Sequence, residues 1–131
     1  MSDEEVTALT VWGEARGEPF GGKVAVAWVI RNRVEKGGWW GDTYETVCKK
    51  PWQFTCWHDH NKDKMLSVKA DDPMYMDSLD AARGVIGGQF PDPTGGATHY
   101  FNPDVVAAPK WALSATETVR IGNHLFFKGV A

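Results

Sequence analysis

The feature that most constrains the fold is an apolar run near the start of the chain, Val24 to Ile30. Taken alone, the run fits a buried strand as well as a helix. Apolar residues keep a helical period from Phe20 to Val34, however, which is too long for a strand. Proline suits the first position of a helix and a glycine pair ends one. We therefore predict a helix from about Pro19 to Gly37-Gly38, with most of its circumference buried.

Around this helix the chain reads as a small, mainly helical α+β domain, a single domain over residues 1–131, with a small antiparallel sheet. Caps, proline positions and the spacing of apolar residues place the other elements. They are a helix from Ser2 or Asp3 to about Trp12, an irregular stretch from 37 to 71 with a helical turn at Thr43 to Cys48, a helix from Asp72-Pro73 to Gly87-Gly88, and strands at Thr98 to Phe101 and Leu125 to Phe127.

Composition and charge exclude several classes of partner. The net charge of -3 argues against nucleic acid, because binding phosphates needs a clustered excess of Lys and Arg. No apolar run is long enough to span a bilayer, so we expect no membrane insertion. The acidic start, Met1 to Glu5, lacks the basic and apolar parts of a secretory signal. We therefore expect synthesis as a soluble cytoplasmic chain, which something else must carry to any target outside the membrane.

The chain has seven tryptophans, more than a core of this size needs. Trp39-Trp40, Trp52 and Trp57 fall in stretches that read as loops. Exposed aromatic rings stack well on sugar faces, which favours a carbohydrate groove. Packing of these rings under long loops is an equally good interpretation, and the sequence leaves both open.

The densest chemistry lies in Trp12 to Pro19, where one predicted helix ends and the next begins. A carboxyl group held against apolar surface there keeps its proton at higher pH, because burial penalises the charged form. That property suits Glu14 as a general acid for glycosidic cleavage. The alternative is that Glu14 and Glu18 are surface charges or partners of Arg16 and Lys23.

Motifs in order along nearly the whole chain, from about residue 6 to 127, resemble one family. They are Gly13 to Pro19 (GEARGEP), Gly22 to Ala27, Asn32 to Val34, Gln53 to Thr55, Asp92 to Pro103 and Ile121 to Phe126. The family is the SleB-type cell wall hydrolases, which include spore cortex-lytic enzymes and related phage endolysins. A GEARGE motif alone would be a weak match, but several motifs over the full domain are specific.

The resemblance implies a lysozyme-like fold of the kind found in lytic transglycosylases and resuscitation-promoting factors, acting on peptidoglycan glycan strands without a cofactor. It implies that Glu14, at the end of the first helix, is the catalytic acid/base. Compared with longer family members, we expect no separate peptidoglycan-binding domain, and we note an insertion-like stretch from Trp57 to Asp71. Substrate-binding residues implied by the likeness are Gln53, Phe54, Thr55, Tyr100, Asn102 and His124, with Tyr100 and His124 close to Glu14.

The expected reaction cuts the β-1,4 bond between N-acetylmuramic acid (MurNAc) and N-acetylglucosamine (GlcNAc). Glu14 protonates the bridging oxygen and then removes the proton of the muramoyl C6 hydroxyl, which closes a 1,6-anhydro ring. Tyr100 and His124 would orient Glu14 or bind the N-acetyl group, or else only pack in the strand layer. No spacing selects a second carboxylate for a two-carboxylate muramidase among Asp42, Asp59, Asp63 and Asp72.

Cysteine and histidine in the middle of the chain raise a competing interpretation. Cys48, Cys56, His58 and His60 are residue types that zinc prefers, but their spacing matches no familiar zinc motif, so we predict no metal. The two cysteines fit a disulfide outside the cytoplasm or free thiols inside it.

Two classes of function remain. The first is a bacteriolytic glycosidase, most simply a monomeric phage endolysin that waits in the cytoplasm for release by a holin. The second is a glycan- or protein-binding module that keeps the fold without the activity. Retention of Glu14 together with Gln53, Thr55, Tyr100 and His124 favours the enzyme.

Overall fold

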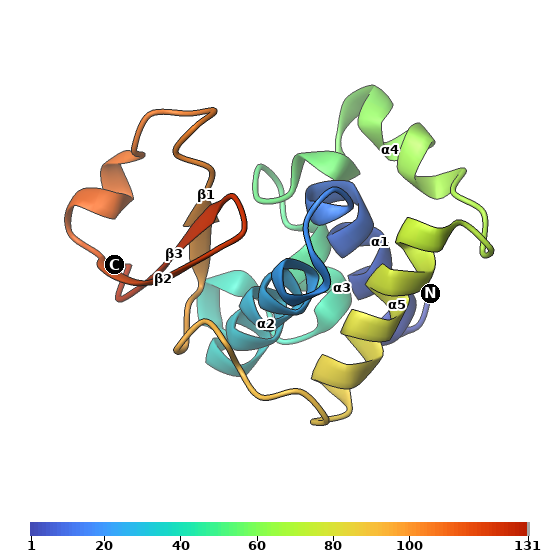
Figure 1. Cartoon of the computed structure of the whole chain (residues 1–131), viewed down its shortest axis with the longest axis horizontal. Coiled ribbons are helices and arrows are strands. Elements are labelled where there is room, and N and C mark those ends of the chain that lie inside the picture. The colour runs from blue at the N-terminus through green and yellow to red at the C-terminus, as the bar shows by residue number, and fades with distance from the viewer. Residues whose placement is uncertain (131) are drawn as a thin grey trace.

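The computed structural model describes residues 1–130, apart from the side chains of Asp59 and His60. A group of helices lies beside a small antiparallel sheet (Figure 1). Within residues 1–130 the helices are α1 (Asp3–Ala15), α2 (Phe20–Lys36), α3 (Tyr44–Lys49), α4 (Asp59–Leu66) and α5 (Pro73–Ile86), the strands are β1 (His99–Phe101), β2 (Thr116–Ile121) and β3 (His124–Lys128), and the short 3-10 helices are η1 (Gly38–Trp40), η2 (Thr55–Trp57) and η3 (Lys110–Leu113). In the described part of the chain, no helix combines the length and apolar character that crossing a membrane requires.

Local signals set the ends of the long helices, as predicted. Ser2 accepts a hydrogen bond from the Glu5 amide, and the Glu5 carboxylate accepts one from the Ser2 amide, which closes a capping box on α1. Gly37, with a φ of 62°, ends α2. Asp72 caps α5 ahead of Pro73. The one difference is that α1 continues past the predicted end, to Ala15, so its last turn contains the candidate acid.

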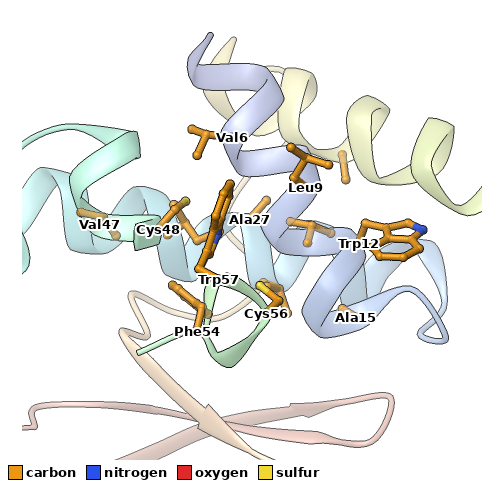
Figure 2. Close-up of a cluster of buried hydrophobic side chains, with 14 of the residues drawn as sticks. Val6, Leu9, Trp12, Ala15, Ala27, Val47, Cys48, Phe54, Cys56 and Trp57 are labelled. Carbon is orange, nitrogen blue, oxygen red and sulfur yellow. The ribbon is translucent and has the colours of Figure 1, made fainter. Parts of the chain in front are cut away.

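The main core lies between α1, α2, α3, η2 and α5. The Trp57 indole crosses this core and donates to the Thr10 hydroxyl at 2.9 Å, which ties η2 to α1. Figure 2 shows Trp57 lying between α1 and Cys48, with Phe54 and Cys56 on the side nearer the sheet. The long segment after α2 is therefore anchored in the core by large side chains, although little of it is regular.

The sheet packs against a different stripe of α2 from the one that faces the main core. Its strand order is β1-β3-β2, and Tyr100 of β1 pairs with Phe126 of β3. Phe126 is fully buried with Ala25 and Val29 of α2. Because strand side chains alternate between faces, the neighbouring Phe127 lies on the outer face, where Trp111 of η3 covers it at 5.2 Å between ring centroids.

Two sequence predictions are corrected. The stretch from 37 to 71 is more helical than expected: besides α3, which includes most of the predicted turn, it contains α4 and two 3-10 helices. Met65 is the only buried residue among those of α4 whose side chains are described, so the helix has no apolar period to detect. The strand β2 was not predicted, and it pairs antiparallel with β3.

Candidate active site

Glu14 lies in the last turn of α1, where η2 packs closely against the helix end. The close approach depends on Gly13, because a β-carbon there would lie 2.5 Å from the Cys56 β-carbon. The glycine beside Glu14 therefore allows the segment with Thr55 to lie next to the carboxylate.

The carboxylate opens on a cavity of about 130 Å³ between the end of α1, η2 and α4. The insertion-like stretch from 57 to 71, whose role the sequence left open, forms one wall of it through α4. Among the described lining residues, Glu14 is the only carboxylate. The lining residues are Trp12, Gly13, Glu14, Arg16, Thr55, Cys56, Asn61, Lys64 and Met65.

Burial raises the pKa of Glu14 to about 7, and the positive charge of Arg33 limits that rise. Within the described residues no hydrogen bond or ion pair reaches its side chain. Arg16 donates instead to the carbonyls of Trp12 and Gly13, and Lys23 pairs with Asp77 at 3.8 Å. Glu14 is therefore neither a surface charge nor a partner of Arg16 or Lys23, and both of its protonation states are populated near neutral pH.

Arg33 of α2 lies within electrostatic reach of Glu14, and the sequence interpretation gave it no role. Its Nε donates to the Thr98 carbonyl at 2.8 Å, and its guanidinium lies 4.0 Å from the Trp40 ring centroid and 5.0 Å from that of Phe54. Its Nη1 is buried, and no described residue forms a hydrogen bond with it. Burial lowers the pKa of Arg33 to about 10, and Tyr100 and Glu14 are among the groups that oppose this shift. It is a buried cation behind the carboxylate.

A signal for Arg33 was present in the sequence. Arg33 follows Val26 and Ile30 at spacings of seven and three, which places it on the same buried stripe of α2. A charged residue on a buried stripe requires a specific environment. The sequence interpretation included Arg33 only within the Asn32 to Val34 motif and gave it no role.

Tyr100 and His124 were expected close to Glu14, and the structure brings them to each other. Their ring centroids lie 4.8 Å apart. Burial, followed by the charge of Glu14, raises the pKa of Tyr100 well above its usual value. His124 lies instead beside Glu18, whose Oε1 is 3.5 Å from the His124 Nδ1 atom. Tyr100 thus shares the electrostatic environment of Glu14, while His124 contacts a different carboxylate.

Glu18 has a structural role. It is buried and accepts hydrogen bonds from the backbone amide and side-chain amide of Asn123, at 2.9 and 2.7 Å. These bonds join the turn between α1 and α2 to the turn between β2 and β3. They hold the strand that carries His124 in place, a role that the sequence interpretation did not assign to Glu18 or Asn123.

The other predicted site residues fall in different places. Thr55 is exposed and lines the cavity, and Gln53 is half-buried two residues before it. Phe54 is only 1% exposed and packs against Arg33, which does not favour the expected contact with substrate, and that contact stays a prediction. Asn102 accepts a hydrogen bond from the Asp104 amide in the turn after β1, and its contact with substrate stays a prediction.

The groups considered for a second carboxylate and for zinc are dispersed. Asp72 caps α5, while Asp42 and Asp63 are exposed and do not line the cavity. Asp59 and His60 were also named, and their side chains lie outside the described residues. Cys48 and Cys56 are buried free thiols, and burial raises the pKa of both. Within the described part of the chain, no three side chains of metal-binding type come together.

The fold and the site define a lysozyme-like domain with a half-buried carboxylate, Glu14, at the end of its first helix. A family model described as Cell Wall Hydrolase matches residues 17–127, and the chain belongs to this family. The match begins just after Glu14, but alignments with individual relatives extend over nearly the whole chain.

Among curated relatives, the spore cortex-lytic enzyme of Halalkalibacterium halodurans is 40% identical, over 95% of this chain and 34% of that protein. Those of Bacillus cereus and Bacillus subtilis are 37% and 35% identical, over 45% and 37% of their lengths. The chain therefore spans less than half of these relatives.

Two solved structures agree with the fold. The catalytic domain of the germination-specific lytic transglycosylase SleB from Bacillus anthracis is 37% identical, with a TM-score of 0.73 over 96% of this chain and 93% of that one. The catalytic domain of Bacillus cereus SleB has the same identity and TM-score and is covered to 89%. The predicted fold class is thus confirmed.

Proposed function

We propose that this chain cuts peptidoglycan glycan strands between MurNAc and GlcNAc as a lytic transglycosylase, with Glu14 as acid and then base. The observation that carries the proposal is the lone carboxylate on a cavity, with its pKa raised to about 7. A general acid works best when its pKa lies near the working pH. The name of the Bacillus anthracis relative, a lytic transglycosylase, supports the same reaction.

In the first step, protonated Glu14 donates its proton to the bridging oxygen as the bond from the muramoyl C1 to that oxygen breaks. Positive charge develops at C1 and the ring oxygen, and the new Glu14 carboxylate stabilises it. The C6 hydroxyl of the same ring then bonds to C1 and gives its proton to Glu14. The carboxyl group is restored, no water is consumed, and one carboxylate suffices.

Tyr100 fits a supporting role in this scheme. Its raised pKa keeps the phenol protonated, so it can donate a hydrogen bond near Glu14 without adding negative charge. Thr55, on the cavity wall, can bind sugar hydroxyls. The phenol and the hydroxyl would orient the sugar and Glu14 without taking part in proton transfer.

Zymography on purified peptidoglycan tests the assignment, with wild type beside Glu14→Gln. We expect clearing by the wild type alone; equal clearing by both proteins would remove Glu14 from the reaction. Mass spectrometry of the released muropeptides separates the mechanisms. Products with 1,6-anhydro ends support transglycosylation, and reducing ends would indicate a muramidase that uses water. No binding-only module would release either product.

A phage endolysin acting on growing cells is the finer proposal. It predicts that the protein clears vegetative cell-wall peptidoglycan at least as fast as spore cortex from the same species. Faster clearing of cortex would place the chain with the cortex-lytic relatives in biological role as well as in family.

A further inference from the structure

A second and larger cavity, of about 670 Å³, lies between the end of α2, η1 and the sheet. Its size is in the range of ligand-binding pockets. We call it the aromatic cavity, because four of its lining side chains are aromatic rings. These are Trp39, Trp40, His99 and Trp111. None of them lines the cavity beside Glu14.

Trp39 contributes little to the core. Its side chain is 64% exposed, and it contacts Trp40 at 4.8 Å between ring centroids with the two planes 73° apart. An indole left in water gives up most of the stabilisation that burial would provide. The Lys50 ammonium lies 4.2 Å from its centroid and holds the ring by a cation–π contact. Trp39 thus presents an exposed aromatic ring whose orientation is stabilised by Lys50.

The charge of the aromatic cavity is positive although the net charge of the chain is -3. Lys36 is the only charged residue on its described wall, and Lys50 stands over Trp39. His99 adds no charge near neutral pH, because burial and the cations Arg33 and Lys36 lower its pKa to about 4. The wall therefore combines aromatic faces with cations and an uncharged imidazole. These suit the apolar face of a sugar, its polar substituents and a nearby carboxylate.

The aromatic cavity shares structural parts with the candidate active site. Trp40 lies on its wall and stacks on Arg33, whose charge acts on Glu14. His99 and Tyr100 are consecutive on β1, so one faces the aromatic cavity and the other faces the helices next to Glu14. Strand β1 and the Trp40–Arg33 contact thus connect the wall of the aromatic cavity with the surroundings of Glu14.

We propose that the aromatic cavity is a second binding site for peptidoglycan, which takes an N-acetylated sugar ring of the strand against Trp39 and its peptide carboxylate against Lys36 and Lys50. The site would bind the glycan strand at a point distant from the bond that is cut. This inference rests on the proposed function for its substrate, but binding and cleavage can be measured separately.

The test measures binding in a Glu14→Gln background, where the strand is not cut. The full chain is sedimented with insoluble peptidoglycan, and Trp39→Ala is compared with Trp52→Ala. Trp52 is the matched control, because it is 84% exposed and does not line the cavity. We expect Trp39→Ala to weaken binding about tenfold, the range of an aromatic anchor, and Trp52→Ala to leave it unchanged. Trp39→Phe should recover part of the loss.

Equal binding by the Trp39→Ala and Trp52→Ala proteins would overturn the inference, as would a parent that does not sediment with peptidoglycan. With Glu14 intact, Trp39→Ala should raise the substrate concentration needed for half-maximal rate and leave the maximal rate unchanged. If binding follows this pattern while no anhydro-muropeptides form, the cavity proposal stands and the proposed reaction fails. If anhydro-muropeptides form normally and Trp39→Ala binds peptidoglycan as well as the parent does, the proposed reaction stands and the cavity proposal fails. Thermal unfolding checks that each variant is folded.

Discussion

Glu14 is held in a place where its ionised form is unfavourable. Its folded-state pKa is about 7, above the ordinary value of 4.5, so folding favours the protonated carboxyl. The stability associated with that proton is present at low pH and is lost as pH rises through about 7. The property that suits Glu14 for proton transfer therefore reduces stability at the pH at which it works.

Glu14→Gln should accordingly stabilise the protein in a pH-dependent way. At pH 8 the amide replaces a half-buried carboxylate, and we expect a gain on the order of 2 kcal/mol, less than the full pKa shift implies because solvent reaches part of the group. At pH 4 it replaces a neutral carboxyl, and the change should be near zero. Urea unfolding at the two pH values measures the difference. An equal effect at both would contradict the raised pKa.

Arg33 opposes the effect of burial on the pKa of Glu14, because its positive charge favours the ionised carboxylate. Removing that charge in Arg33→Gln should raise the pKa of Glu14 above about 7. The alkaline limb of the pH profile of kcat/KM, where the acid loses its proton, should then move to higher pH. Arg33→Lys keeps the charge and should keep the limb in place, which separates an electrostatic role from packing. An unmoved limb in the Gln variant would count against this role.

At the level of elements, local signals account for what could be predicted. These signals act within one helical turn, so the sequence could predict the start of α1 from Ser2, the end of α2 from Gly37 and the start of α5 from Asp72 and Pro73. Helix α4 was not, because it is held mainly by Met65 and its remaining described residues are exposed. Its contribution to the cavity wall depends on tertiary packing alone.

The candidate site likewise contains residues that the sequence could predict and residues whose positions depend on tertiary contacts. Glu14 and Thr55 could be predicted because they belong to motifs, Gly13 to Pro19 and Gln53 to Thr55, that resemble those of a known family in the same order. Arg33 could have been found from its place on the buried stripe of α2, but its stacking on Trp40 and Phe54 joins separate segments and is contained in no local pattern. The contact of Glu18 with Asn123 joins distant parts of the chain and was equally hidden.

The turn between β2 and β3 offers a test of that contact. Gly122 has a φ of 58°, and a β-carbon on it would lie 2.5 Å from the Glu18 Oε1 atom. Gly88 also has a positive φ, of 75°, but a β-carbon there meets nothing within 4 Å. Both alanine variants bear the backbone penalty of about 1 kcal/mol. Gly122→Ala should destabilise by about 1–2 kcal/mol more, because it displaces a buried charged acceptor. Equal unfolding midpoints would contradict the contact.

On the scale of the whole molecule, the site depends on how the sheet is attached to the helices. Glu14 and Arg33 come from the helical part, while Tyr100 comes from the sheet. The junction is a small cluster in which Phe126 is fully buried against Ala25 and Val29. Tyr100 packs on both this cluster and the main core, so the two cores are continuous. The active site should therefore lose its geometry whenever the junction loosens.

Phe126→Ala tests this dependence. Truncating a buried phenylalanine leaves a cavity and should lower the free energy of unfolding by about 3 kcal/mol, whereas Leu113→Ala, at a residue 83% exposed, should change it by less than about 0.5 kcal/mol. Since the cores are continuous, the buried thiols of Cys48 and Cys56 should become reactive at the same urea concentration at which tryptophan fluorescence changes. Thiols that stay protected after the fluorescence transition would mean that the sheet detaches by itself, leaving Glu14 on a folded helical part without Tyr100 beside it.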